Sequence, residues 1–385
     1  MKTTKHFNRP HPLWIELMRI TFTSLVMMIS MLSMQGMENT SDKIQNRLPK
    51  YGQIQLKLQE NVLIREIEGD PNYSFGRALG DLAVDKKGNL FVLDFDRILK
   101  YDSRGKFIGT IGKKGEGPGE FQQPNKIFIH ERGDVYISDR GRILHVFGND
   151  GKYMKQIKLS FMISLGTKNL FVDRDGNVFA AMMEMSESGP NTVLVKADLN
   201  GKIIKKIEVF IDRNTKVTGS RSGGVMGGLI HGYSERLYFY PVQQTLLCCG
   251  ANTNYELSLF DLNGNLKTAF SKEEDAKQIS AAEKKYFGPS AVFPSHRPYF
   301  NNILSDEDGR IYILRSKSIL DKNPAIEIDI FDQNGHYLYR TEAPFKPQVL
   351  VNESFYSIEQ DENQMRMIKK WTIRNYRELK ANSND

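Results

Sequence analysis

The chain has 385 residues, of which 40% are hydrophobic and 26% charged, and a net charge of +7. This length and composition are typical of one large or two ordinary globular domains with a packed core. The first 36 residues hold +3 of the net charge, because they contain four basic side chains and a single acidic one, Glu16. The remaining charge is mild and dispersed, so we expect no nucleic-acid partner.

Only two cysteines are present, Cys248 and Cys249, and they are adjacent. Neighbours along a strand point to opposite faces, so no disulfide framework is expected. We interpret them as two small buried strand residues, with a strained vicinal disulfide or a redox role as the alternatives. Two cysteines are too few for a zinc site built from cysteine ligands.

Residues 20–34, ITFTSLVMMISMLSM, form an uncharged run that follows basic residues. A bilayer span needs roughly 20 apolar residues, so this shorter run is typical of a secretory signal. We therefore expect an exported protein, periplasmic or extracellular, with residues 1–36 as the signal peptide and 37–53 as a linker. Translation that begins at Met18 instead of Met1 would also give a complete short signal. Because Met34 and Gly36 make a weak cleavage site, the alternative is an uncleaved anchor, which would be the only membrane contact.

From Ile54 onward one turn recurs, with an Asp, two variable residues and a Gly. Copies begin at Asp85, Asp102, Asp173, Asp198, Asp261, Asp306 and Asp332, with a near copy at Gly148. Alternating apolar residues flank the copies, which predicts antiparallel hairpins whose Asp caps the turn and whose Gly adopts a positive φ. A calcium loop would need alternating carboxylates and a distal Glu, and the spacing does not provide them.

These turns occur in pairs, and the pairs repeat. The glycines of the second turn in each pair follow one another at intervals of 46 to 71 residues, at Gly105, Gly151, Gly201, Gly264 and Gly335. Repeats of this length, each with about four short strands, are typical of a β-propeller. The predicted blades are 79–111, 125–158, 168–209, 228–270, 300–341 and an incomplete sixth at 352–373.

The segment 60–68 is expected to supply the outer strand that the sixth blade lacks. Pairing the two ends of the chain closes the ring and removes exposed strand edges. The sequence therefore predicts an all-β fold, a six-bladed β-propeller of four-stranded antiparallel blades over 54–375, followed by a tail, 376–385. A closed ring has no structural need for a partner, so we expect a monomer.

Two insertions interrupt the repeats. Residues 271–287 have helix-forming composition, with a Ser before the acidic residues and Gly288-Pro289 as a stop, and predict a short helix outside the ring. The Gly-rich stretch 218–228 is expected to be a flexible loop. Both are alternatively interpreted as lids over the mouth of the central channel.

The glycine-rich stretch KKGEGPGEFQQP, residues 113–124, has the glycines of a phosphate-binding loop. However, Glu116 and Glu120 place negative charge where a phosphate would lie, and no helix follows. We interpret it instead as the crossing from the first blade to the second, in which Phe121 inserts between the two blades.

The sequence IGKKGEGPGEFQQPNKIFI followed by GDVYISDRGRILHVFGNDGKY is similar to an NHL-type repeat. Together with FPSHRPYFNNILSDEDGRIYIL and SFYSIEQDENQMRMIKKW, it resembles exported bacterial six-bladed β-propeller proteins with a G-x-G-P-G-E-[FY] signature. The resemblance covers about residues 54–375. It implies a fold with little attached chemistry, since relatives with NHL-type blades include protein- and RNA-binding modules, scaffolds and a lyase that acts on hydroxyglycine peptides.

Propellers usually bind ligands at one mouth of the channel, on the loops between the second and third strands and between blades. The candidate ligand-binding residues on these loops are Asp94, Asp96, Arg97, Asp139, Arg140, Arg142, His231, Tyr233, His296, Arg297 and Arg315. Asp and Arg at these corners also have a structural interpretation, because they pair between adjacent blades and hold the ring together.

The case for catalysis is weaker. A zinc lyase needs several convergent His side chains, whereas His130, His145 and His336 are predicted to lie on different faces. No G-x-S-x-G elbow and no Cys–His pair is present. We expect a module that binds a protein, peptide or glycan, with no cofactor and no catalysis. The alternative is a lyase or hydrolase on the propeller axis, with one divalent metal, Zn or Ca, held by loop carboxylates and by one or both of His231 and His296.

Overall fold

A computed structural model describes residues 43–76, 79–164, 170–186, 189–211, 233 and 235–384. The expected signal or anchor, the Gly-rich stretch 218–228 with its alternative role as a lid, and His231 lie outside these residues. Among the residues described, no helix is long and apolar enough to cross a membrane.

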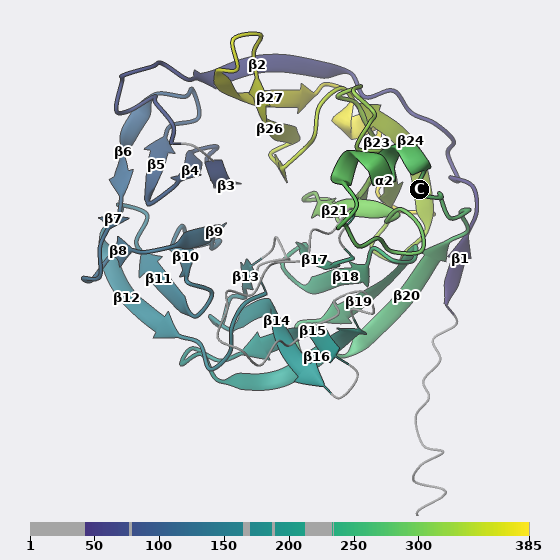
Figure 1. Ribbon diagram of the computed structural model, residues 1–385, viewed down its shortest axis with the longest axis horizontal. Helices are drawn as coiled ribbons and strands as arrows, with labels where there is room; N and C mark the ends of the chain where they lie inside the picture. The colour runs from purple at the N-terminus through teal and green to yellow at the C-terminus, as the bar shows by residue number, and fades with distance from the viewer. Residues whose placement is uncertain are drawn as a thin grey trace, which may run out of the picture. The chain divides into compact units, whose positions relative to one another are not determined.

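The described strands form six four-stranded antiparallel sheets arranged as a β-propeller, called blades 1 to 6 in chain order (Figure 1). Blades 1 to 3 are β3–β6 (Leu79–Val84, Leu90–Asp94, Arg97–Tyr101, Phe107–Ile111), β9–β12 (Pro124–Ile129, Val135–Asp139, Ile143–Phe147, Tyr153–Lys158) and β13–β16 (Leu170–Val172, Val178–Ser186, Gly189–Ala197, Ile203–Ile211). Blades 4 to 6 are β17–β20 (Leu237–Val242, Leu246–Ala251, Glu256–Asp261, Leu266–Lys272), β21–β24 (Phe300–Ser305, Ile311–Arg315, Ile326–Phe331, Tyr337–Ala343) and β25–β27 (Val349–Val351, Ser354–Gln360, Arg366–Ile373) with β2 (Leu58–Arg65). The predicted fold is confirmed.

The ring closes through β2, which pairs antiparallel with β27 from Leu58 opposite Ile373 to Arg65 opposite Met367. The N-terminal strand thus completes blade 6, as the sequence predicted, and Figure 1 shows it along the outer edge of that blade. One further strand was not predicted. β1 (Ile44–Asn46) adds a parallel fifth strand to blade 4 beside β20.

After β1, the chain continues along the outer strand of blade 5. The backbone N–H of Lys50 donates to Tyr337 O at 2.9 Å and that of Ile54 to Arg340 O at 2.9 Å. Residues 44–65 therefore contact the outer edges of blades 4, 5 and 6 in turn, which blocks three strand edges that would otherwise be exposed.

The C-terminal residues lie against blade 5. Arg310 is almost fully buried, and its Nη1 donates to Leu379 O at 2.6 Å while its guanidinium lies 4.4 Å from the ring centroid of Tyr376. Tyr376 belongs to a short 3₁₀ helix, η1 (Tyr376–Glu378). The tail is thus attached to the propeller by a buried cation.

The hydrophobic core is divided among the six interfaces between neighbouring blades. One cluster, for example, joins Phe91 of blade 1 to Val135 of blade 2, and another joins Phe171 of blade 3 to Phe239 of blade 4. Cys248 and Cys249 point to opposite sides of blade 4, because Cys248 packs toward blade 5 and Cys249 toward blade 3. Both thiols are free, and burial raises the pKa of each. Their interpretation as small buried strand residues is confirmed.

The recurrent turns are capped as predicted. In each D-x-x-G copy the Asp Oδ1 accepts hydrogen bonds from the N–H groups two and four residues later, as Asp102 does from Arg104 and Lys106, both at 2.9 Å. The turns occupy the 1–2 and 3–4 connections of the blades. Because neighbouring strands are antiparallel, these connections share one face of the ring, here called the lower face.

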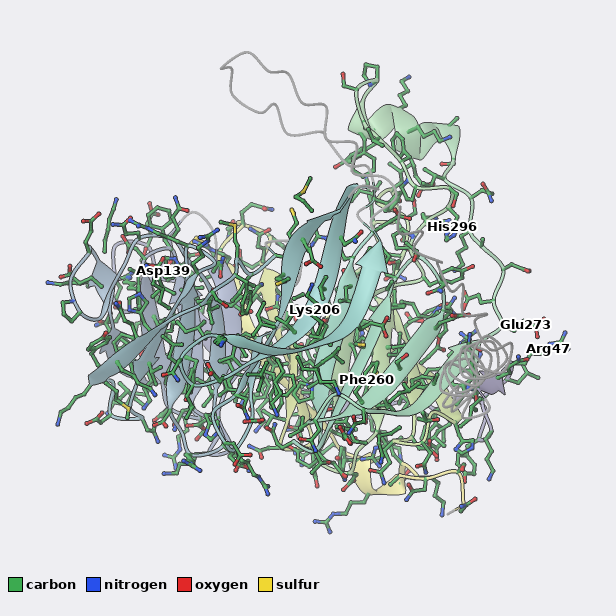
Figure 2. All side chains as sticks on the ribbon, turned by 90° about the horizontal axis from the view of Figure 1, so that it is seen from below. Arg47, Asp139, Lys206, Phe260, Glu273 and His296 are labelled. Atoms are coloured by element: carbon green, nitrogen blue, oxygen red, sulfur yellow. The ribbon has the colours of Figure 1, made fainter. Side chains whose placement is uncertain are left out.

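The upper face carries the 2–3 connections and the crossings between blades. Figure 2 shows it at the top, with Asp139 at the end of β10 and helix α2 projecting above the ring. Helix α2 (Ala281–Phe287) is shorter than the predicted 271–287. Ser271 and Lys272 belong to β20, and residues 273–280 are not helical. The N-cap of the helix is Ser280, which forms a capping box with Glu283, and the helix ends at Gly288 as expected.

The stretch 113–124 is a crossing between blades, as interpreted. It holds a two-stranded parallel pair, β7 (Lys113–Lys114) and β8 (Glu120–Phe121). Phe121 is fully buried in the cluster between blades 1 and 2. Glu120 accepts from Gly117 N at 2.9 Å and lies 3.3 Å from Lys113 Nζ, so its charge is used within the loop.

One turn without glycine gives a stability prediction. Asp361 accepts from the N–H groups of Asn363 and Met365 at 2.9 and 3.0 Å, as in the D-x-x-G copies, but Gln364 occupies the glycine position with a φ of 65°. Gln364 is exposed. Gln364→Gly is expected to raise the free energy of unfolding by about 1 kcal/mol, because it removes left-handed strain without loss of packing. Urea unfolding checks this, and a variant no more stable than wild type would contradict it.

Candidate binding site on the upper face

The structure places the predicted site residues in three separate regions of the upper face. Asp94, Asp96 and Arg97 lie at blade 1, and Asp139, Arg140 and Arg142 at blade 2. The remaining described candidates, Tyr233, His296, Arg297 and Arg315, lie around blades 4 and 5. Figure 2 shows Asp139 and His296 far apart across the ring. The candidates therefore do not converge on one site.

The first region forms a cleft between blades 6 and 1, here called the 6–1 cleft. It has a volume of about 820 Å³ and is lined by Gly69, Pro71, Ser74, Phe75, Gly76, Asp94, Phe95, Asp96 and Arg97. One wall comes from the crossing that follows β2, and the other from the turn between β4 and β5. Three sequence-predicted residues line this cleft together.

Two of these three residues hold the walls in place. Asp94 is buried and accepts hydrogen bonds from Gly76 N at 2.5 Å and from Arg97 Nε at 3.0 Å. Arg97 Nη2 also donates to Ser74 O at 3.2 Å, so the pair ties the turn to the crossing. This pairing lies within one hairpin, not between the Asp and Arg of adjacent blades.

Phe95 projects from a strained turn at the rim of the cleft. The N–H of Asp96 donates to Asp94 O at 2.7 Å, and Phe95 between them has a φ of 55°. An i to i+2 bond around a residue with positive φ is the rare form of the γ-turn, which is unfavourable for a bulky side chain. Phe95 is nevertheless 65% exposed. Burial in the core therefore does not compensate for the strain.

An ion pair supports the backbone at Phe75, one of the lining residues of the cleft. Phe75 is buried, and its carbonyl accepts from Arg366 Nη2 at 2.7 Å. Arg366 also pairs with Glu66 at 2.8 Å. Burial alone would raise the pKa of Glu66, but the hydrogen bonds from Arg366 and from Phe75 N outweigh it and keep that pKa below its usual value. Both groups are thus charged and paired at neutral pH.

The third of the predicted lining residues, Asp96, has a carboxylate that pairs with no described residue. It is half-buried, and among the described residues its carboxylate makes no hydrogen bond or ion pair. The cleft thus presents one available carboxylate beside one exposed aromatic ring. Sequence reasoning selected the charged residues of LDFDRI and missed Phe95, although an aromatic residue in so short a turn is itself a signal.

The second region, at blade 2, repeats the capping seen at blade 1. Asp139 is buried and accepts from the N–H groups of Gln122 and Gln123, at 3.1 and 2.5 Å, where the chain enters blade 2. Arg140 has a φ of 50° and lies 3.7 Å from Glu116. Arg142 is exposed.

His145 lies beneath this corner and gives a pH prediction. It is buried, neither ring nitrogen has a hydrogen-bond partner, and its Nε2 lies 3.5 Å from Asp139 Oδ2. Burial lowers its pKa below the usual 6.5, although Asp139 opposes the shift. Between 6.5 and the folded-state pKa the unfolded chain binds more protons, so stability falls as the pH falls through this window.

His145→Leu is therefore expected to lose less stability than wild type between pH 7.5 and pH 5. Urea unfolding of both proteins at the two pH values measures the difference. An equal loss in both would show that His145 does not titrate differently in the folded and unfolded states.

The third region contains a buried ionic network between blades 4 and 5. Asp329 is fully buried and accepts from Lys272 Nζ at 2.6 Å and Tyr255 Oη at 2.6 Å. Its other contacts are with Tyr337, Arg340 and Arg315. Burial would raise the pKa of Asp329, but the ammonium of Lys272 lowers it overall. Burial lowers the pKa of Lys272 to about 8. Arg315, predicted as a ligand contact, is part of this network.

Helix α2 is attached to blade 5 by a buried carboxylate. Glu283 accepts from Tyr233 Oη at 2.5 Å and from Ser318 Oγ at 2.7 Å, and lies 3.5 Å from Arg297 Nε. Burial would raise the pKa of Glu283, but these hydroxyl donors and the cap at Ser280 lower it to about 2. Tyr233 and Arg297 thus lie under α2.

A second cleft lies between blades 3 and 4. It has a volume of about 690 Å³, and its lining includes Glu208, Glu235, Glu256 and His296. His296 Nδ1 lies 2.9 Å from the carbonyl oxygen of Arg297. Glu256 pairs with Lys43. Within the described ranges, no group of three His, Cys, Asp or Glu side chains is arranged to hold a metal ion.

Comparisons with known proteins give a family and a fold. The profile of the Domain of unknown function (DUF4934) matches residues 83–384. A "Putative exported protein" from Bacteroides fragilis has a similar structure, with a TM-score of 0.54 at 12% identity, covering 86% of this chain and 99% of that chain. A member of the DUF4221 family from Bacteroides vulgatus matches with a TM-score of 0.44 at 12% identity, covering 82% of this chain and 98% of that one. No curated protein matches the chain.

Proposed function

The chain belongs to the DUF4934 family, and from this premise we propose that it is an exported binding module that holds a protein, peptide or glycan in the 6–1 cleft without catalysing a reaction. Export is supported by the expected N-terminal signal and by the description of the Bacteroides fragilis neighbour. The site lies on the rim of the upper face and not on the propeller axis.

The observation that carries this proposal is Phe95. A bulky side chain with a φ of 55° lowers stability, and at 65% exposure its burial does not compensate. Backbone strain of this kind concentrates at ligand clamps, where a bound molecule uses the side chain that the strain projects. The adjoining cleft, at about 820 Å³, falls within the usual range of ligand pockets.

The charged groups of the cleft are arranged to hold its walls. Asp94 is saturated by Gly76 and Arg97, and Glu66 is paired with Arg366. A general acid or base needs a carboxyl group free to exchange its proton with a substrate. Only Asp96 meets this condition among the described lining residues, and a single carboxylate is better suited to binding.

Replacement of Phe95 tests the proposal. Phe95→Gly is expected to raise the free energy of unfolding by about 1 kcal/mol, since Gly tolerates the turn. It should also weaken ligand binding at least about 10-fold, the expected loss for a buried aromatic anchor. The full chain is screened against peptide and glycan libraries, and each hit is titrated with wild type and variant.

Ile108→Ala is the matched control, because Ile108 is a similarly exposed apolar residue on the outer strand of the same blade. It should leave the affinity for every hit unchanged. Hits that bind Phe95→Gly as tightly as wild type would overturn the assignment of the site.

A further inference from the structure

We propose that the 6–1 cleft recognises a basic side chain, the guanidinium of arginine or the ammonium of lysine, within a peptide. The cation stacks on Phe95 and pairs with Asp96. This inference rests on the proposed function and names the chemistry of its ligand.

The charges around the cleft favour a cation. Asp94 is neutralised by Arg97, and Glu66 by Arg366. One carboxylate that lines the cleft, Asp96, then stays without a cationic partner among the described residues. Asp70 lies between the lining residues Gly69 and Pro71, and its carboxylate accepts from the N–H of Asn72 at 2.8 Å. The described part of the cleft is therefore acidic, although the whole chain carries a net charge of +7.

The hydrogen-bonding groups of the cleft also favour a cationic ligand. Among its described donors, Gly76 N donates to Asp94, and Arg97 donates from Nε and Nη2. The carboxylate of Asp96 can still accept. A sugar alternates donors and acceptors and needs both from its site, whereas arginine and lysine side chains only donate. The carboxylate of Asp96 is thus matched to a basic side chain.

Phe95 supplies the second contact. The face of an aromatic ring is electronegative and attracts a cation placed over it. The neighbouring Asp96 adds a charge-assisted hydrogen bond, stronger than a neutral one. Because the γ-turn restrains the backbone of these two residues, less backbone entropy is lost on binding.

The cleft is larger than one side chain requires. A volume of about 820 Å³ leaves room for backbone on both sides of the basic residue. The ligand is therefore a peptide segment and not a free amine, and its flanking residues contact Pro71 and Gly69 on the crossing.

The test uses nine-residue peptide libraries with a fixed central residue and randomised flanks, passed over the immobilised full chain. The central residue is arginine, lysine, citrulline or glutamate; citrulline has nearly the shape of arginine without its charge. Retention of the arginine and lysine libraries is expected to exceed that of the citrulline library at least about 10-fold, since a charged hydrogen bond outweighs a neutral one. Equal retention of arginine and citrulline, or preferred retention of glutamate, would overturn the inference.

Two variants separate the contacts. Asp96→Asn keeps the shape of the side chain and should weaken binding of the best arginine peptide about 10-fold. Phe95→Leu keeps apolar area but removes the aromatic face and should weaken it about 3- to 5-fold. Ile108→Ala should bind like wild type. An Asp96→Asn variant that binds the arginine peptide as tightly as wild type would also overturn the inference.

The outcomes distinguish this inference from the proposed function. Glycan hits that depend on Phe95, with no preference for arginine or lysine peptides, would overturn the inference and leave the binding module standing. If Phe95→Gly bound peptides and glycans as tightly as wild type, both the inference and the proposed function would be overturned.

Discussion

Asp329→Asn is expected to lower the free energy of unfolding by about 3–5 kcal/mol, because it breaks a buried ion pair and leaves Lys272 with Glu274, 3.0 Å away, as its remaining carboxylate partner among the described residues. Lys272 and Asp329 are both buried, 2.6 Å apart. The asparagine amide carries no negative charge. Its NH₂ group would also point at hydrogen-bond donors from which the carboxylate oxygens of Asp329 now accept. Urea unfolding of wild type and variant at pH 7 measures the change.

Glu327→Gln is the matched control for this effect. Glu327 pairs with Arg315 at 2.8 Å in the same region, but its side chain is 51% exposed. An exposed ion pair contributes about 0–1 kcal/mol, so the control should be nearly as stable as wild type. If Asp329→Asn and Glu327→Gln changed stability equally, the buried network would not hold blades 4 and 5 together.

Gly105→Ala is expected to destabilise the propeller by at least about 3 kcal/mol, through the combined cost of a left-handed backbone and a steric clash. Gly105 has a φ of 82°, and a Cβ there would lie 1.9 Å from Leu63 O. Leu63 belongs to β2, the strand that closes the ring. The backbone of blade 1 would therefore have to move away from blade 6.

Gly52→Ala separates the two costs. Gly52 has a φ of 74°, but a Cβ there would meet nothing within 4 Å. Only the backbone cost applies, about 1–2 kcal/mol. Equal losses in Gly105→Ala and Gly52→Ala, measured by urea unfolding, would show that contact with Leu63 does not matter.

Gly105 also explains why the fold could be predicted from the sequence. The 3–4 turns of blades 1, 3, 4 and 5 are each capped by an Asp, and the 3–4 turns of blades 1 to 5 all hold a Gly with a positive φ. This glycine also approaches the outer strand of the preceding blade, as Gly201 approaches Lys158. These local demands recur in blades 1 to 5, so they leave a periodic signal. Counting that signal gave the blades and showed that the sixth needed an outer strand from the N-terminus.

The interactions that depend on tertiary structure left no such signal. Strand β1 pairs with β20 across more than 200 residues, and its three residues, IQN, have no strand pattern of their own. Lys272 and Asp329 come from different blades, and neither lies in a motif. The predicted start of the helix was wrong for a related reason: Ser271 and Lys272 pair in β20, and the helix begins only after the capping box at Ser280.

For the candidate site, the sequence selected loops of the upper face but did not reveal the structural roles of their residues. Asp94 and Asp139 end the second strands of blades 1 and 2, and in the structure each caps the backbone that enters its blade. Their ligand-binding role stays a prediction. Phe95 became a candidate only when its backbone angle and exposure were seen together.

Hydrogen–deuterium exchange of the full chain, with and without the best hit from the peptide and glycan screens, tests the central claim most directly. Ligand in the 6–1 cleft should slow exchange of the crossing, residues 66–76, and of the turn around Phe95, and leave the other upper loops unchanged. Slower exchange around 251–256 and 295–299 instead, beside the cleft between blades 3 and 4, would contradict the account.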